Sequence, residues 1–387
     1  MVPPQGYTKA LPSQVCKLQR SLYGLKQASR QWNIELTKFL LSRGFTQSKS
    51  DYSLFSKVTN DRHIFLLVYV DDLLLAGDDH QGILDTKQAL HTAFTIKDLG
   101  LACYFLGIEI SRSSQGTFLN QRKYILDILQ DAGLTGAKPT RFPLPKNLHL
   151  SLDTGEFLPD PSPYRRLVGR LLYLTLTRPD LSYSVQHFSQ FLQNPRQPHY
   201  HAALHVLRYL KGTANTGLFY PSQNSLQLFA CTDADWGTCK HSARSLTGYC
   251  VFLGSSLVSW KTKKQKTVAK SSAEAEYRSM SATTSELEWL HSLLQDFHID
   301  IPLPITMFCD NKAAQHIAQN PVFYEGTKHL RIDCHYTRDK VLEGFLQTSH
   351  VPSAERLADL MTKPLSEAQH FYLSSRLGLM DSPPIPP

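Results

Sequence analysis

Residues 64–77 read IFLLVYVDDLLLAG, in which two apolar runs meet at the adjacent acids Asp71 and Asp72. Apolar runs interrupted by a short polar pair predict a strand, a tight turn and a second strand. Two carboxylates at the tip of a buried hairpin repel each other and lose part of their hydration shells, and a divalent cation would offset both costs. The alternative is an ordinary hairpin with an Asp-Asp turn.

The composition bounds the number of domains and the class of partner. At 387 residues, 42% of them hydrophobic, the chain is long enough for two or three domains with buried cores. Lys and Arg outnumber Asp and Glu by 41 to 33, and the resulting net charge of +8 suits a polyanionic partner such as nucleic acid. Many basic proteins bind no nucleic acid, so charge alone does not decide the partner.

Cysteine usage and hydropathy indicate the compartment. The seven cysteines lack the paired spacing of zinc or redox motifs, which favours reduced thiols. No apolar run approaches the roughly 18 residues of a membrane span, and the N-terminus MVPPQGY has no signal-peptide pattern. We therefore expect a cytoplasmic or nuclear protein that is not secreted, has no transmembrane segment and has no membrane partner.

The pattern along the chain predicts several domains. Apolar spacing predicts helices over 27–43 and 80–94 beside the hairpin, and a strand over 103–111 with a bulge at Gly107. Helices over 121–132, 164–177 and 199–211 surround a proline-rich joint. The expected domains are residues 1–118, 119–222 and 223–370, followed by a tail over 371–387.

The last domain has a regular succession of elements. LQLFACT, TGYCVFL and SLVSWK predict three strands, and a long helix follows over 272–297. ITMFC predicts a fourth strand, followed by a short helix, a strand near FLQTSHV and a helix from about 354. This order, three strands and then helix, strand, helix, strand, helix, is that of the ribonuclease H fold.

Four acids of this domain lie where a solvated acid has no reason to be. Asp233 follows the first strand on the side of its apolar residues, and Glu276 lies within the apolar stripe of the long helix. Asp310 ends the fourth strand, and Asp359 lies between two apolar residues of the last helix. Carboxylates are the ligands that hard cations require, although each acid taken singly has a structural alternative in a turn, an ion pair, a helix cap or the surface.

Motifs in both halves of the chain resemble one family. LYGLKQA (22–28), YVDD (69–72) and YFLGI (104–108), together with TDADW (232–236), SSAEAEY (271–277), CDNKAA (309–314) and ERLADLMTKPL (355–365), resemble motifs of copia-type retrotransposon Pol polyproteins. The resemblance runs from about Pro4 to about Leu365. It implies an α/β and α+β architecture: a partial reverse-transcriptase palm, a thumb or connection, and a ribonuclease H-like α/β domain with a mixed five-stranded sheet.

The resemblance also implies roles for individual residues. Asp233, Glu276, Asp310 and Asp359 correspond to the catalytic, metal-binding acids of the ribonuclease H, which uses two Mg²⁺ ions, with Mn²⁺ as a substitute. His350 lies near the position of a histidine that helps the product leave, and a plain loop histidine is the alternative. Among the polymerase residues, Asp71 and Asp72 correspond to metal-binding acids and Lys26 to a contact of the incoming nucleotide, with a solvated surface lysine as the alternative.

Basic residues supply a candidate nucleic-acid surface. The run from Trp260 to Lys270 offers an aromatic ring and several charges to a nucleic-acid backbone, and so do the helices of the middle domain. Solvated helix faces and a solvated loop are the alternatives. The candidates in the run are Lys261, Lys263, Lys264 and Lys266, and those in the helices are Arg208 and Lys211, with Arg165, Arg166, Arg170 and Arg178 as further possibilities.

Polymerase chemistry in the family needs a further catalytic Asp upstream of LYGLKQA. Only 21 residues precede Leu22, and none of them forms that motif, so we expect a polyprotein fragment that does not copy RNA by itself. The expected function is Mg²⁺-dependent cleavage of the RNA strand of an RNA/DNA hybrid, with hybrid and primer-template as partners, and association with itself or other Pol regions. The alternative is a catalytically silent remnant that only binds nucleic acid.

Overall fold

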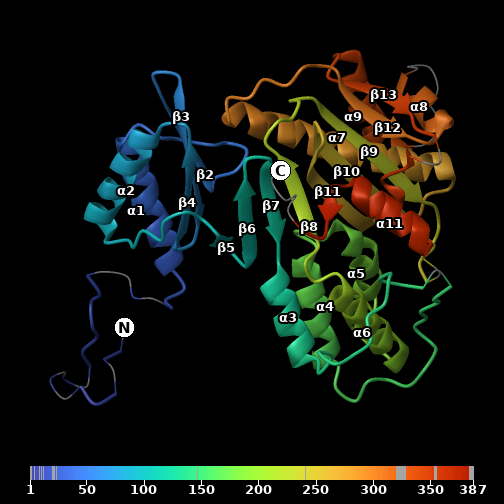
Figure 1. Ribbon diagram of the computed structural model, residues 1–387, viewed down its shortest axis with the longest axis horizontal. Coiled ribbons are helices and arrows are strands. Elements are labelled where there is room, and N and C mark those ends of the chain that lie inside the picture. The colour runs from blue at the N-terminus through green and yellow to red at the C-terminus, as the bar shows by residue number, and fades with distance from the viewer. Residues whose placement is uncertain are drawn as a thin grey trace. The chain divides into compact units, whose positions relative to one another are not determined.

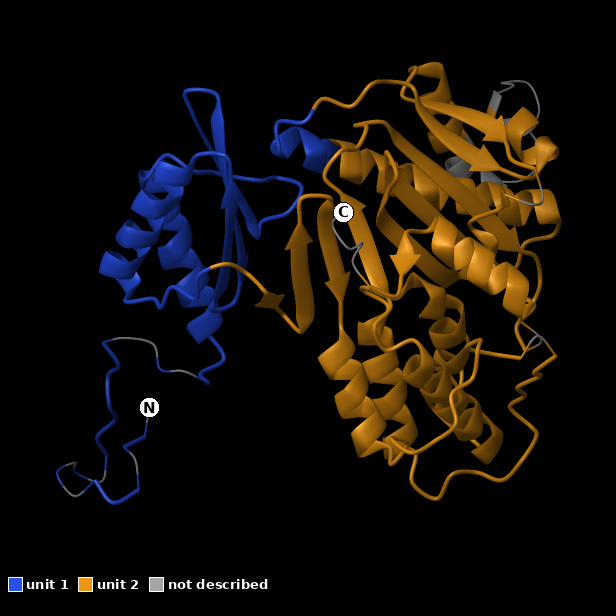
Figure 2. Ribbon diagram, in the orientation of Figure 1, with its two compact units in different colours: residues 1–100, 292–299 blue, residues 101–291, 300–387 orange. Residues whose placement is uncertain are grey.

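The computed structural model describes residues 2–382 except 4, 8, 10, 12, 20, 21, 23, 146, 240, 320–327, 353 and 354, and it leaves out the side chains of 317, 319 and 328–334. The chain divides into two compact units, which are coloured separately in Figure 2. Unit 1 comprises residues 1–100 with 292–299, and unit 2 comprises residues 101–291 with 300–387. The division at 291 places the last residues of one long helix with unit 1.

Unit 1 is an antiparallel sheet packed against two helices (Figure 1). Leu36 and Leu40 of one helix and Leu90 of the other share a buried core with Ile64 and Leu66 of the sheet. The helices and the hairpin predicted from the sequence are confirmed. The strands, in sheet order, are β1 (Thr46–Gln47), β2 (Leu54–Thr59), β3 (Arg62–Tyr69) and β4 (Asp72–Gly77), and the helices are α1 (Ala28–Ser42) and α2 (His80–Phe94).

The first sheet of unit 2 is antiparallel and draws its strands from distant parts of the chain. Its order is β14 (Leu379–Met380), β8 (Gly217–Pro221), β7 (Gly116–Asn120), β6 (Ile108–Ser113) and β5 (Tyr104–Phe105). Phe105 pairs with Ile108, so Leu106 and Gly107 form a two-residue turn in which φ is +47° and +77°. The predicted bulge at Gly107 is therefore wrong: the glycine supports a hairpin turn, for which positive φ is required.

A helical layer follows in unit 2. Its buried core joins residues from all of its α-helices, including Ile125, Leu171, Phe188 and Leu207. The helices predicted over 121–132, 164–177 and 199–211 are confirmed to within three residues at each end. The layer consists of α3 (Arg122–Asp131), α4 (Ser162–Leu174), the short η1 (Pro179–Leu181), α5 (Ser182–Ser189) and α6 (Gln197–Gly212).

The second sheet of unit 2 is mixed, with strand order β11-β10-β9-β12-β13. β9, β10 and β11 are antiparallel, whereas β12 runs parallel to both β9 and β13. The predicted order of elements is confirmed, except that two helices stand where one short helix was expected. The elements are β9 (Leu228–Asp235), β10 (Leu246–Leu253), β11 (Ser256–Lys264), α7 (Ser272–Asp296), β12 (Ile305–Cys309), α8 (Lys312–Gln319), α9 (Lys328–Leu342), β13 (Leu346–His350), α10 (Asp359–Thr362) and α11 (Glu367–Arg376).

Helices cover both faces of this mixed sheet. On one face Tyr249 Oη donates to Glu286 Oε2 at 2.8 Å and ties β10 to α7. On the other face Cys231 and Cys250 join a buried core with Leu360 and Leu373, which belong to α10 and α11. The last helix of the sequence prediction begins at Asp359 and not near 354, a position that lies outside the described residues.

The structure differs from the expected domain limits at two places. Residue 118 lies inside β7, so the expected boundary there would divide a sheet. Residues 371–380 were assigned to a tail, yet they form most of α11 and all of β14, and Leu377 and Leu379 are buried. The C-terminal segment is therefore part of the core of unit 2.

Candidate metal centre

Two strands place Asp233 and Asp310 at the same level. β9 and β12 are parallel, and Phe308 lies opposite Cys231. Asp310 and Asp233 each follow that pair by two residues, so the register carries them to one edge of the sheet. Asp233 is 2% exposed and lies within β9, not beyond it as predicted, because β9 continues to Asp235 in its pairing with β10.

The helix α7 brings Glu276 to the same edge. Ser279, one turn further along, donates from Oγ to the carbonyl oxygen of Asp233 at 2.8 Å and also bonds Thr232 Oγ1 at 2.8 Å. These bonds fix α7 against β9. Glu276 is 5% exposed, and its Oε2 finds no hydrogen-bond partner among the described residues.

The short helix α10 adds Asp359 to the cluster. Thr362 Oγ1 donates to Asp233 Oδ2. Lys363 Nζ lies between two carboxylates, 3.1 Å from Asp233 Oδ1 and 2.6 Å from Asp359 Oδ1. Gly248 of β10 makes this approach possible, because a Cβ there would lie 2.5 Å from Thr362 Cγ2. The four predicted acids are thus brought together.

Basic side chains neutralise part of this cluster. Arg356 Nη1 lies 2.8 Å from Asp310 Oδ2, while Lys363 serves Asp233 and Asp359. Sequence reasoning missed Arg356, Thr362, Lys363 and Gly248. Three of them stand within ERLADLMTKPL beside Asp359, so their place in the motif was the available signal, but their contacts depend on the tertiary fold.

The pKa values of the acids reflect their burial and their mutual repulsion. Burial, with Asp233 and Asp310 adding to it, raises the pKa of Glu276 to about 9. Burial also raises the pKa of Asp359, although its bond from Lys363 works in the opposite direction. The neighbouring Asp235 has its pKa raised to about 6, again mainly by burial. The surroundings therefore do not fully stabilise the negative charge of the cluster, and binding of a cation would supply the missing positive charge.

The residues present fit a divalent cation. Ligand atoms of Glu276, Cys309 and Asp310 lie within 4.8 Å of one another. Burial raises the pKa of the Cys309 thiol, so that sulfur stays protonated and is a poor ligand. The available donors are carboxylate oxygens, with the orphaned Glu276 Oε2 among them, and these suit Mg²⁺ or Mn²⁺.

The structure places His350 near the same edge of the sheet. It is the last residue of β13 and pairs with Cys309, directly before Asp310. Its side chain is exposed. Its role in product release stays a prediction.

The predicted polymerase residues lie in unit 1 and are exposed. Val70 and Asp71 form the turn between β3 and β4, and Trp32 Nε1 donates to the carbonyl oxygen of Val70. Asp71, Asp72 and Lys26 all face solvent. The expectation that the two acids are buried together is therefore wrong, because only the strands below the turn are in the core.

Three of the four candidate lysines in the basic run are exposed. Lys261, Lys263 and Lys266 face solvent, whereas Lys264 Nζ bonds Gln190 Oε1 at 3.1 Å. Trp260 was expected to offer its ring to nucleic acid, but its Nε1 donates to the carbonyl oxygen of Thr175 at 2.9 Å and its ring packs on the core. Trp260 is partly buried, and the contact of its ring with nucleic acid stays a prediction.

The basic residues of the middle helices divide into two groups. Arg208 is exposed, while Lys211 Nζ donates to the carbonyl oxygen of Ala137. Arg178 has no solvent exposure and pairs with Asp180 at 2.7 Å, so it does not face a phosphate backbone. None of the helices in the described ranges combines the length and apolar character needed to span a bilayer.

Several known proteins are similar to parts or all of this chain. A family model described as reverse transcriptase (RNA-dependent DNA polymerase) matches residues 1–146. The Retrovirus-related Pol polyprotein from transposon RE1 of Arabidopsis thaliana is 44% identical over 99% of this chain, and the chain spans 26% of that polyprotein. RNase H1 from Halobacterium salinarum, a solved structure, is 20% identical, with 35% of this chain and 94% of that chain covered at a TM-score of 0.26.

A further relative is covered almost completely. The putative transposon Ty5-1 protein of Saccharomyces cerevisiae is 36% identical over 74% of this chain, and the alignment covers 94% of that protein. Together with the polyprotein match and the reverse transcriptase family model, this relative shows the family. The chain belongs to the copia-type retrotransposon Pol family.

Proposed function

We propose that this chain is a magnesium-dependent ribonuclease that cleaves the RNA strand of an RNA/DNA hybrid. The observation that carries the proposal is the convergence of Asp233, Glu276, Asp310 and Asp359 from four separate elements. Buried acids without a matching set of partners are costly, and they cluster where a cation is bound. The orphaned Oε2 of Glu276 is the clearest sign of such a site.

The four acids would hold the cations and orient the substrate. Mg²⁺ bound there would stabilise the charge that develops on the phosphate and lower the pKa of the attacking water, as in sites that hold a pair of ions roughly 3.5–4 Å apart. Asp233 is oriented by Thr362 and Lys363, and Asp310 by Arg356. Glu276 must give up a proton before it binds a cation, because its pKa is about 9.

The substrate surface would include the exposed lysines of β11 and the loop that follows. Lys261 and Lys263 lie on the same side of β11, and Lys266 lies in the loop that follows the strand. Charges of this kind bind a phosphate backbone without reading its sequence. The exposed acids Asp71 and Asp72, with Lys26, would belong to a separate primer-template site in unit 1.

The test is cleavage of a labelled RNA/DNA hybrid by the purified chain with Mg²⁺. We expect products with 3′-hydroxyl and 5′-phosphate ends, and loss of cleavage by at least roughly a hundredfold in Asp310→Asn, since the substitution removes a charged ligand. Asp300→Asn is the matched control, because Asp300 is exposed and precedes β12, whereas Asp310 directly follows it. If all three proteins retard the hybrid on a gel but leave it intact, the chain is a nucleic-acid-binding remnant.

A further inference from the structure

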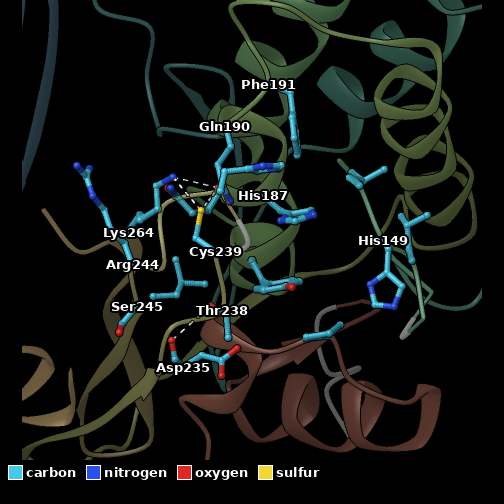
Figure 3. A pocket seen from close by; sticks show the side chains of 17 residues that line it. His149, His187, Gln190, Phe191, Asp235, Thr238, Cys239, Arg244, Ser245 and Lys264 are labelled. Atoms are coloured by element: carbon cyan, nitrogen blue, oxygen red, sulfur yellow. Dashed lines mark hydrogen bonds between the residues drawn. The ribbon is translucent and has the colours of Figure 1, made fainter. Parts of the chain in front are cut away.

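Unit 2 contains a second chemically unusual site, an open cavity of about 260 Å³. It lies between the loop that joins β9 to β10 and the helix α5, and Figure 3 shows the side chains that line it. A water molecule takes about 30 Å³ in the liquid, so the cavity has room for a small organic molecule but not for a folded partner. Cys239 is one of the residues that line this cavity.

Three side chains converge on the sulfur of Cys239. Ser242 Oγ donates to Sγ at 3.0 Å, and Lys264 Nζ lies 3.4 Å from Sγ. The thiol itself donates to Gln190 Oε1 at 3.3 Å, and Lys264 also bonds this oxygen at 3.1 Å, as the dashed lines of Figure 3 show. Ser242 and Lys264 can therefore donate hydrogen bonds to the thiolate form of Cys239, and Gln190 accepts the proton of its thiol form.

The thiol differs from the other buried cysteines. Burial alone would raise the pKa of Cys239, but hydrogen bonds from Ser242 and the backbone of His241, with the charge of Lys264, lower it overall. Burial raises the pKa of Cys250 and Cys309 well above the ordinary value. The surroundings of Cys239 at the wall of the cavity favour the thiolate, which is the nucleophilic form, whereas those of Cys250 and Cys309 favour the protonated thiol.

The charges around the cavity indicate what it would accept. The described titratable and charged groups in its lining come from β9, β11, α5 and the adjoining loops, and they are Asp235, Lys264, Tyr183, His187, His149, Cys239, His241 and Arg244. Lys264 and Arg244 outnumber the one acid, Asp235. His187 stays neutral at pH 7, because burial lowers its pKa to about 4. The cavity therefore favours an anionic molecule.

We infer that Cys239 is a site of reversible modification by small anionic disulfides that enter the cavity. The thiolate sulfur attacks one sulfur of the disulfide, a new S–S bond joins it to Cys239, and the original S–S bond breaks. The other half leaves as a thiolate and takes up a proton from water. Excess small thiol reverses the step by the same exchange. This inference does not depend on the proposed nuclease activity.

The experiment follows each cysteine of the full chain separately. The chain is reacted with the anionic disulfide dithiobis(nitrobenzoate), and in parallel with the neutral dithiodipyridine, then quenched, and peptides are identified by mass spectrometry. At pH 7 we expect Cys239 in the folded chain to react roughly two- to threefold faster than in the urea-unfolded chain, and more so with the anionic reagent. Cys239→Ser must remove the labelled peptide.

Variants decide whether the surrounding cluster causes the reactivity. Lys264→Met and Ser242→Ala should each slow Cys239 and move its rate profile to higher pH, whereas Lys270→Met, at an exposed lysine nearby, should not. Circular dichroism confirms that the variants are folded. A folded-chain rate below that of the unfolded chain, or equal rates in all three variants, would overturn the inference. If folding accelerates the reaction of Cys239 equally with the neutral and the anionic disulfide, the inference that the cavity prefers anions is overturned.

Discussion

Glu276 shows how burial sets the protonation of a single side chain. Its pKa is raised to about 9, first by burial and then by Asp233 and Asp310, whereas an unfolded chain has an ordinary Glu pKa of about 4.5. Between about pH 4.5 and pH 9, Glu276 therefore keeps its proton in the folded state and has lost it in the unfolded state. The contribution to stability is present below about pH 4.5 and falls as the pH rises through about 9.

The first prediction concerns this loss of stability with rising pH. Between pH 5 and pH 9, in the presence of a chelator, the free energy of unfolding of the native chain should fall by at least about 1 kcal/mol more than that of Glu276→Gln. Glutamine keeps the shape and cannot ionise. Urea unfolding at several pH values measures both. Parallel curves for the two proteins would mean that Glu276 is not held protonated by its surroundings.

Lys363 makes a second prediction at the residue scale. Its ammonium bonds Asp233 and Asp359; burial alone would lower its pKa, but these two acids raise it above the ordinary value. In Lys363→Met two largely buried carboxylates lose their partner, so we expect the chain to lose roughly 2–4 kcal/mol of stability in chelator. Added Mg²⁺ should restore part of this loss, because a cation can take over the neutralisation.

The matched control for Lys363→Met is Lys340→Met. Lys340 bonds Glu288 and Glu343 outside the acidic cluster, and its loss should cost less than about 1 kcal/mol and show no added response to Mg²⁺. Thermal unfolding of the three proteins with chelator and with Mg²⁺ supplies the comparison. An equal response of Lys363→Met and Lys340→Met to Mg²⁺ contradicts the assignment.

At the scale of elements, periodicity predicted most of the helices and strands. The apolar stripe of α7 and the alternation of β9 and β12 marked Glu276, Asp233 and Asp310 as candidates. Each still had a structural alternative, and the resemblance to the family decided between the two. The same reasoning failed where the outcome depends on tertiary contacts. Trp260 Nε1 donates to the carbonyl oxygen of Thr175, and Tyr173 Oη donates to the carbonyl oxygen of Leu106 in the turn, and both partners lie far away in the sequence.

Arg178 is the clearest failure of this kind. From the sequence it is one of several arginines on amphipathic helices, yet its guanidinium is fully buried and bonds Asp180, the carbonyl oxygen of Thr213 and Thr213 Oγ1. Tyr209 Oη adds a bond to Asp180 Oδ2 at 2.7 Å. The network joins the end of α6 to η1, and no local pattern could separate it from a solvated arginine.

The network predicts non-additive costs of mutation. Arg178→Met leaves Asp180 charged and without its main partner, which should cost roughly 3–5 kcal/mol, and Asp180→Leu should cost a similar amount. The double variant removes both charges and should cost clearly less than the sum of the two. Urea unfolding of the four proteins completes the cycle. If the double variant loses as much unfolding free energy as the two single variants together, Arg178 and Asp180 do not stabilise each other.

At the largest scale, contacts between segments that are distant in the sequence hold unit 2 together. The sheet of β5, β6, β7, β8 and β14 joins residues 104–120, 217–221 and 379–380, and the pairing of β14 with β8 places Leu379 opposite Leu218. The sequence analysis by local pattern ends the domain at residue 370, shortly after the last motif, which stops at Leu365. It therefore assigned to a tail a segment whose apolar residues fill the core.

The last prediction tests this closure of unit 2. Leu377 has no solvent exposure and packs with Leu218, Met361 and Leu373. Leu377→Ala should lower the free energy of unfolding by about 2–5 kcal/mol, since it removes buried apolar surface and leaves a cavity. Leu342→Ala is the control, because Leu342 is 67% exposed, and it should stay within about 0.5 kcal/mol of the native chain. Urea unfolding measures both variants, and equal small effects would mean that residues beyond 370 behave as a tail after all.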